Sequence, residues 1–172
     1  MENAAQAVGL ALALGQKTRL QVSESAVRQG LLDATWPGRL EKVSEDPRIV
    51  LDGAHNVESV KKMLEGLKRH FDYSAAHVVF ASSCDKDAEG MLSEILAECK
   101  TLLLTEFHNP RATPCRVLAE NIPGDSKKVV VRPDPRQALL KAVSLAGPGD
   151  LVLVMGSLFL VGELRQFALE GF

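Results

Sequence analysis

Short aliphatic and β-branched runs alternate with amphipathic segments along most of the chain, and this alternation limits the possible folds more than any other feature. The predicted strands cover residues 48–51, 77–81, 101–105, 129–131 and 151–155. Helices are expected over residues 57–71, 88–98, 114–120, 135–146 and 161–170. Such a sequence predicts an α/β fold, a Rossmann-like three-layer domain with a mostly parallel sheet covered on both faces.

The amino-terminal part of the chain follows a different pattern. Residues 3–14 are rich in Ala and Leu and predict a helix, and Ser23 suits the N-cap of a second one. The sequence Trp36-Pro37-Gly38-Arg39 then interrupts the pattern, as Pro followed by Gly does at boundaries. We expect one segment over residues 1–37 and the main domain over residues 38–172.

Composition excludes several classes of function. The 20 basic and 22 acidic residues give a net charge of −2, and the chain has one Trp and one Tyr, so neither a nucleic-acid footprint nor a polybasic membrane patch is expected. No apolar run is long enough to span a membrane, and no signal peptide is recognised. Cys84, Cys99 and Cys115 are widely spaced and predict reduced thiols, hence a cytoplasmic protein. The histidines show no metal spacing, so no metal site is predicted.

Three common nucleotide and hydrolase motifs are missing from the 172 residues. There is no G-x-x-x-x-G-K-[ST] phosphate loop, no G-x-G-x-x-G after a strand and no G-x-S-x-G. A phosphate-cradling loop, an ordinary dinucleotide site and an α/β-hydrolase site are therefore not predicted.

Ligands of parallel sheets bind at the carboxyl ends of the strands, which directs attention to L-D-G-A-H-N at residues 51–56. Asp52 supplies a carboxylate that can accept from two hydroxyls, such as those of a ribose, and His55 can donate, accept or carry charge near neutral pH. The same motif also fits a plain turn, with Asn56 capping the next helix. The sequence does not decide between a ligand site and a turn. For a functional site we expect Asp52 and His55 on an exposed loop.

Two further strand ends carry polar residues. Lys86, in the D-K-D sequence, can bind an anion, and Ser157, after Gly156, offers a hydroxyl beside helix N–H groups. Helix capping, by Asp87 in the first case and by Ser157 in the second, is the favoured interpretation of each motif alone. Arg111 is either loop surface or an anion contact, and the sequence does not choose.

Four sequence motifs, in this order and spacing, together resemble one family. They are W-P-G-R-L-E, L-D-G-A-H-N, D-K-D and G-S-L-F-L-V-G. It is the folylpolyglutamate synthase and bifunctional dihydrofolate synthase family, related to the Mur ligases. The resemblance spans about residues 3–162, and its specific part is the first two motifs. The family usually has Pro after D-G-A-H-N, where this chain has Val57.

The resemblance implies an ATP-dependent amide ligase that adds L-glutamate to folate or pteroate through an acyl phosphate. Such enzymes join a central P-loop ATPase domain to a smaller Rossmann-like carboxy-terminal domain. Residues 38–172 would correspond to the carboxy-terminal domain. Residues 1–37 would correspond to the helical tail of the ATPase domain and would lack a core of their own. ATP and Mg²⁺ would be the cofactors, with metal ligands mostly in the ATPase domain that these residues lack. The complete enzyme is expected to be a monomer, and this chain alone to be inactive.

The resemblance also assigns site residues. Asn3 would lie near the adenine, Arg39 would reach the nucleotide phosphates, and Asp52 would serve both the nucleotide and catalysis. His55 would be the second catalytic residue.

Lys86 and Ser157 fall where related ligases hold the carboxylate of the incoming amino acid. If the sheet is parallel, the loops that carry them and the loop after residue 51 should line one shared concavity.

Other functions remain open at this stage. One is a non-catalytic Rossmann-like module that binds a nucleotide or acidic metabolite, and another is an interaction domain without a small-molecule site. A third is a Mur-type peptidoglycan ligase, although the W-P-G-R and G-A-H-N motifs favour the folate branch.

Overall fold

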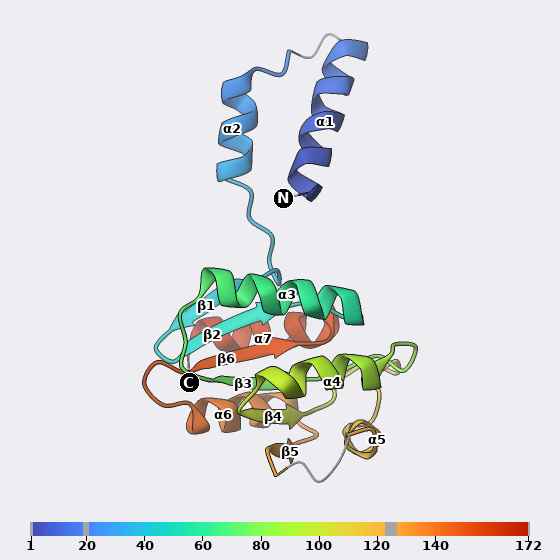
Figure 1. Ribbon diagram of the computed structural model, residues 1–172, viewed down its shortest axis with the longest axis vertical. Coiled ribbons are helices and arrows are strands. Elements are labelled where there is room, and N and C mark those ends of the chain that lie inside the picture. The colour runs from blue at the N-terminus through green and yellow to red at the C-terminus, as the bar shows by residue number, and fades with distance from the viewer. Residues whose placement is uncertain (1, 19–20, 123–126, 172) are drawn as a thin grey trace. The chain divides into compact units, whose positions relative to one another are not determined.

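The computed structural model describes residues 2–18, 21–122 and 127–171, and the chain divides into two compact units, Met1–Trp36 and Pro37–Phe172. The first unit contains helices α1 (Glu2–Lys17) and α2 (Glu24–Leu32) (Figure 1). In this unit none of the described side chains, over residues 3–18 and 21–36, is buried. The expectation of helices without a core of their own is confirmed for these residues.

The second unit is built on a six-stranded sheet in the order β1-β2-β6-β3-β4-β5. The strands are β1 (Glu41–Glu45), β2 (Arg48–Asp52), β3 (Ala76–Phe80), β4 (Thr101–Leu104), β5 (Val129–Val131) and β6 (Leu151–Met155). All neighbours pair in parallel except β1, which runs antiparallel to β2. The predicted α/β fold with a mostly parallel sheet is confirmed.

Helices cover both faces of this sheet and complete three layers (Figure 1). They are α3 (Val57–His70), α4 (Ala88–Glu98), α5 (Cys115–Glu120), α6 (Pro135–Leu145) and α7 (Leu158–Glu170). Apolar residues of α3, α4 and α5 share one core cluster, and those of α6 and α7 share the other. In the described part of the chain, no helix has both the length and the apolar character needed to cross a bilayer.

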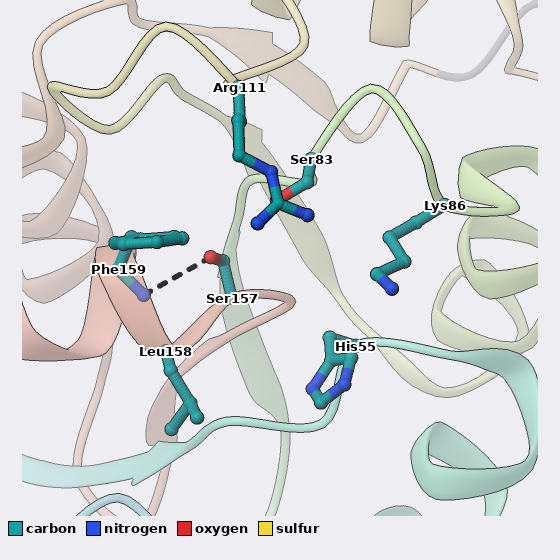
Figure 2. Close-up of a pocket in the computed structure, with 7 residues that line it drawn as sticks. All are labelled: His55, Ser83, Lys86, Arg111, Ser157, Leu158 and Phe159. Carbon is teal, nitrogen blue, oxygen red and sulfur yellow. Dashed lines mark hydrogen bonds between the residues drawn. The ribbon is translucent and has the colours of Figure 1, made fainter.

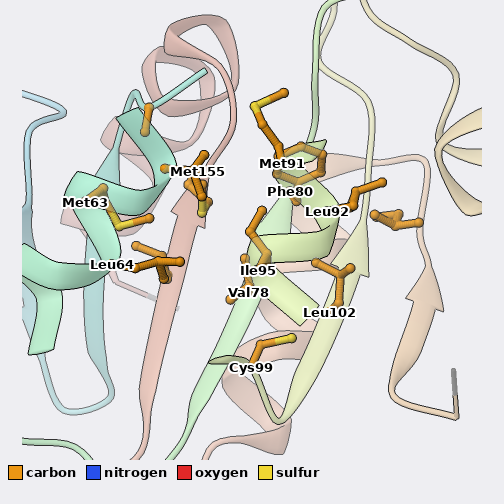
Figure 3. Packing of buried hydrophobic residues seen from close by; sticks show 14 of the residues in the cluster. Met63, Leu64, Val78, Phe80, Met91, Leu92, Ile95, Cys99, Leu102 and Met155 are labelled. Atoms are coloured by element: carbon orange, nitrogen blue, oxygen red, sulfur yellow. The ribbon is translucent and has the colours of Figure 1, made fainter. Parts of the chain in front are cut away.

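The two core clusters follow from the alternation of side chains along the strands. Val78 and Phe80 of β3 face α3 and α4, whereas Val79 faces α6 and α7. Figure 3 shows Ile95 of α4 beside Val78 of β3, and Met63 of α3 on the side of Met155 of β6. Because β3 and β6 are buried along their whole lengths, their ends are held rigidly.

At the edge of the sheet where the parallel strands begin, a polar cluster of two buried residues and one exposed lysine links the starts of three strands. His77 Nε2 lies 3.2 Å from Asp150 Oδ2, and Lys100 Nζ lies 3.3 Å from the same oxygen. The Gly147 amide donates to Asp150 as well. His77 is 1% exposed, and among the described residues its Nδ1 has no hydrogen-bond partner. Its contact with Asp150 gives it a structural role at this edge of the sheet.

Two elements differ from the sequence-based prediction. β1 was not predicted, because Glu41–Glu45 is an edge strand with one apolar residue, Val43. Helix α7 begins at Leu158 and not at Val161, because Ser157 caps it earlier than the apolar spacing suggests.

Candidate functional site

A concavity of about 260 Å³ opens at the edge of the sheet where the parallel strands end (Figure 2). The loops after β2, β3 and β4 and the β6–α7 junction line it. Its lining residues are His55, Ser83, Lys86, Arg111, Ser157, Leu158 and Phe159. Three of the predicted site residues, His55, Lys86 and Ser157, therefore meet in one place. At this volume the concavity is smaller than the roughly 300–1,000 Å³ of drug-sized sites, which suits a ligand the size of an amino acid.

Asp52 is not part of this lining, and the expectation that it lies on an exposed loop is wrong. Its side chain turns into the domain and is 5% exposed. Oδ1 accepts from the Ala54 amide at 2.7 Å and Oδ2 from the Leu40 amide at 2.8 Å. Burial raises the pKa of the Asp52 carboxyl, although these two amides and the charge of Arg39 act in the opposite direction.

The W-P-G-R-L-E segment folds against the end of β2. The Gly53 amide donates to the Gly38 carbonyl at 2.8 Å, next to the bond from Leu40 to Asp52. Gly38 itself has a positive φ of 71°, a conformation that favours glycine. Arg39 is exposed, and its guanidinium lies so close to Gly53 that a Cβ there would come within 3.3 Å of it. The two family motifs thus form one hydrogen-bonded unit that holds Arg39 at the end of β2.

Glu41 extends this unit to α7. Its carboxylate accepts from the Gly38 amide at 2.8 Å and from two nitrogens of Arg165. The Arg165 side chain, which donates the main hydrogen bonds, holds the pKa of Glu41 below its usual value.

His55 lies at the pocket with a defined ring orientation. Its Nδ1 is 2.8 Å from the Gly53 carbonyl, which can only accept, so Nδ1 carries the hydrogen. In the neutral ring Nε2 is then the acceptor. Asn56 accepts from the Ser59 amide and caps α3. The cap interpretation of D-G-A-H-N is confirmed for Asn56. His55 lines the pocket, and its catalytic role stays a prediction.

Ser157 is both a helix cap and a pocket residue. Its Oγ accepts from the Phe159 amide at 3.2 Å and begins α7. Gly156 makes this turn possible, since its φ is 102° and a Cβ would lie 2.3 Å from the Ala81 carbonyl oxygen. The first turn of α7 therefore presents N–H groups at the pocket, an arrangement that attracts anions.

The loops that carry Lys86 and Arg111 are joined to each other. Ser83 and Ala112 form an isolated antiparallel bridge, and the Cys84 amide donates to the Arg111 carbonyl at 2.9 Å. These bonds bring Arg111 to the pocket, where Figure 2 shows its guanidinium pointing into the same space as the Lys86 ammonium. Two cationic side chains and a helix N-terminus give the site the chemistry to hold carboxylates.

An aromatic pair and a histidine–glutamate contact join the loop after β4 to α7. Phe107 and Phe159 stack with ring centroids 5.4 Å apart. His108 contacts Glu163 through its amide at 3.0 Å and through Nδ1. His108 is not among the described residues that line the pocket.

The remaining predicted residue, Asn3, lies in α1 of the first unit, and its nucleotide contact stays a prediction. Over residues 2–18, 21–122 and 127–171, no group of three or more His, Cys, Asp or Glu side chains is arranged to hold a metal ion. In that part of the chain the site chemistry rests on cations, a histidine and a hydroxyl.

Comparison with known proteins agrees with this geometry. The family model described as "Mur ligase, glutamate ligase domain" matches residues 38–158. The dihydrofolate synthase/folylpolyglutamate synthase of Bacillus subtilis (strain 168) is 33% identical over 165 residues, which cover 96% of this chain and 38% of that protein. The chain thus spans well under half the length of this relative.

Solved structures share the fold. The structure of E. coli FolC in complex with DHPP and ADP has a TM-score of 0.85 and 29% identity, covering 96% of this chain and 38% of that one. A bifunctional folylpolyglutamate synthase/dihydrofolate synthase with Mn, AMPPNP and L-glutamate bound has a TM-score of 0.77 and 28% identity. It covers 91% of this chain and 38% of that chain.

Proposed function

Because the chain belongs to the Mur ligase family through its glutamate ligase domain, we propose that it is the glutamate-binding part of an ATP-dependent ligase. The reaction is the addition of L-glutamate to folate or pteroate. The relatives that support this choice of substrates are the dihydrofolate and folylpolyglutamate synthases described above.

One observation carries the proposal. Lys86, Arg111 and the first turn of α7 converge on one small concavity at the carboxyl edge of the sheet. Glutamate has two carboxylates, and two cations together with helix N–H groups are the partners that such a ligand needs. Ser83 and Ser157 add hydroxyl groups that orient it.

In the proposed reaction, ATP would transfer its terminal phosphoryl group to the carboxylate of the folate or pteroate, and ADP would leave. The amine of glutamate then attacks the acyl phosphate, an amide bond forms and phosphate leaves. The ammonium of glutamate must first lose a proton, and we assign that proton to Nε2 of His55, whose Nδ1–H is held by Gly53. Positioning the amine against the acyl phosphate supplies much of the rate.

The nucleotide side of the site is proposed in the same way. Arg39 is assigned to the ATP phosphates and Asn3 to the adenine. Asp52 is assigned a positioning role, because its carboxylate holds Leu40 and Ala54, the neighbours of Arg39 and His55. ATP with Mg²⁺ would act together with a P-loop ATPase domain, which is the proposed partner of this chain. The two-domain division, with residues 1–37 belonging to that ATPase domain, is part of the same proposal.

A chimera tests the function directly. The 172-residue chain replaces the matching part of the Bacillus subtilis enzyme, and ATP-dependent incorporation of L-glutamate into dihydropteroate and tetrahydrofolate is measured. We expect incorporation that is lost in a Lys86→Ala variant, whereas a surface variant such as Lys61→Ala keeps it. A folded chimera that hydrolyses ATP without transferring glutamate, or that transfers another amino acid instead, would show that the glutamate assignment is wrong.

A further inference from the structure

The carboxylate of Asp85 lies beside the candidate pocket and binds both of its cationic side chains. Its Oδ2 is 3.2 Å from Lys86 Nζ, and its Oδ1 is 3.0 Å from a guanidinium nitrogen of Arg111. Lys86 and Arg111 line the pocket, whereas Asp85 is not among the lining residues in the described part of the chain. We propose that Asp85 is a positioning residue, a brace that keeps the two cations together at the glutamate site; this inference rests on the proposed function.

The backbone alone does not fix these side chains. The bridge between Ser83 and Ala112 joins the two loops, but Lys and Arg side chains are long and keep considerable rotamer freedom beyond the backbone. Asp85 connects the ends of both across the gap between the loops. Arg111 uses one of its guanidinium nitrogens for this contact, and the single Lys86 nitrogen carries three N–H groups, so both side chains keep N–H donors for a ligand.

Electrostatics supports a brace. Two like charges at one pocket repel each other, and a carboxylate between them offsets that repulsion. The Arg111 guanidinium, followed by the Lys86 ammonium, holds the pKa of Asp85 below its usual value, so the brace is charged at neutral pH.

The contribution to folding should be small. The side chains of Asp85 and Arg111 are 46% and 56% exposed, and ion pairs this exposed add little to stability. A position whose charge matters for binding and not for folding is what a site brace requires.

The brace also bears on specificity. Glutamate presents two carboxylates, whereas glutamine presents one and a neutral amide. A site that holds two cations side by side binds a ligand with two carboxylates more strongly than a ligand with one. Asp85 should therefore strengthen the preference for glutamate over glutamine.

Titration of the 172-residue chain with L-glutamate and with L-glutamine, followed by NMR, tests the brace in the Asp85→Asn variant. We expect glutamate to bind roughly tenfold more weakly, because two long side chains must then be ordered on binding. Glutamine binding should change much less, and Asp85→Glu should restore part of the loss. The matched control is Glu94→Gln, which removes the carboxylate of an ion pair between helices, 3.3 Å from Lys61. It should leave both affinities unchanged.

Each other outcome is informative. If the unmodified chain binds no glutamate, the proposed function and the brace both fail, since there is no site to hold. If the unmodified chain binds glutamate and Asp85→Asn binds it equally well, the brace alone is overturned. Tighter binding by Asp85→Asn would show that Asp85 competes with the ligand, and an equal loss in Glu94→Gln would show a general charge effect; both contradict the brace.

Discussion

Asp52 and His55 belong to one short motif, yet the first points into the domain and the second lines the pocket. Asp52→Ala would leave the buried Ala54 amide and the part-buried Leu40 amide without acceptors, so we expect a loss of about 1–3 kcal/mol in the free energy of unfolding. His55→Ala removes a half-buried side chain with one local bond, and we expect a loss within about 0.5 kcal/mol. Urea unfolding of the 172-residue chain measures both changes.

In the chimera, the two variants should lose activity for different reasons. His55→Ala should lose turnover while the protein stays folded, because the proton acceptor is gone. Equal destabilisation by both substitutions, with turnover intact in His55→Ala, would assign the whole motif to turn formation.

Asp150 gives a pH dependence of stability. The Gly147 amide, with His77 and Lys100, holds the pKa of Asp150 below its usual value of 3.8. A carboxyl with a lowered folded-state pKa stabilises the fold above its unfolded-state pKa, and that contribution is lost as the pH falls through the folded-state value. Asp150→Asn should therefore cost about 1–3 kcal/mol at neutral pH.

The difference in unfolding free energy between the wild type and Asp150→Asn should narrow as the pH falls below 3.8. It should close once the pH is below the lowered folded-state pKa, because the wild-type carboxyl is then protonated in the folded state as well. Unfolding by urea at neutral pH and at pH values below 3.8 measures this difference. If this difference in unfolding free energy did not change with pH, the packing of Asp150 and not its charge would account for the stabilisation.

Sequence reasoning located His55, Lys86 and Ser157 because each follows a predicted strand, and strand ends meet at one edge. It could not choose a role for Arg111, since that residue reaches the pocket through the bridge between two loops far apart in sequence. It also assigned Asp52 an exposed position, because the partner that buries its carboxylate, the Leu40 amide, comes from another motif.

At the scale of elements, the β6–α7 junction depends on one glycine. Gly156→Ala should destabilise the chain by about 2–5 kcal/mol, because φ is positive and the new Cβ meets the Ala81 carbonyl. Gly162, within α7, is the matched control, since a Cβ there has no heavy atom within 4 Å. Gly162→Ala should stabilise by about 0.5–1 kcal/mol through helix propensity. Thermal unfolding of both variants checks this, and similar melting temperatures would contradict it.

The buried strands and their helices could be predicted because apolar runs and helical spacing are strong signals. β1 could not be predicted, since Val43 is the single apolar residue among its five residues and the strand gains its pairing from β2. The start of α7 was placed late, because Leu158 and Phe159 are exposed and their place in the helix comes from the Ser157 cap.

At the scale of the molecule, the proposed function assigns to the 172 residues only the glutamate-binding part of the ligase. We expect the purified chain neither to hydrolyse ATP nor to ligate glutamate, because phosphoryl transfer depends on groups that cradle the phosphates and the metal, and the sequence has no P-loop. Phosphate release and labelled-glutamate incorporation measure the two activities, with the chimera as positive control. ATP-dependent ligation by the chain alone would contradict the proposed division of labour.

The bonds between the W-P-G-R-L-E turn and the end of β2 have an evolutionary consequence. The Gly53 amide needs the Gly38 carbonyl, and the Leu40 amide needs the Asp52 carboxylate, so neither segment keeps its shape without the other. Substitutions in the two motifs should therefore be inherited as pairs. In an alignment of relatives, positions 38–40 and 52–53 should covary, and a lineage that changes one motif should carry a compensating change in the other.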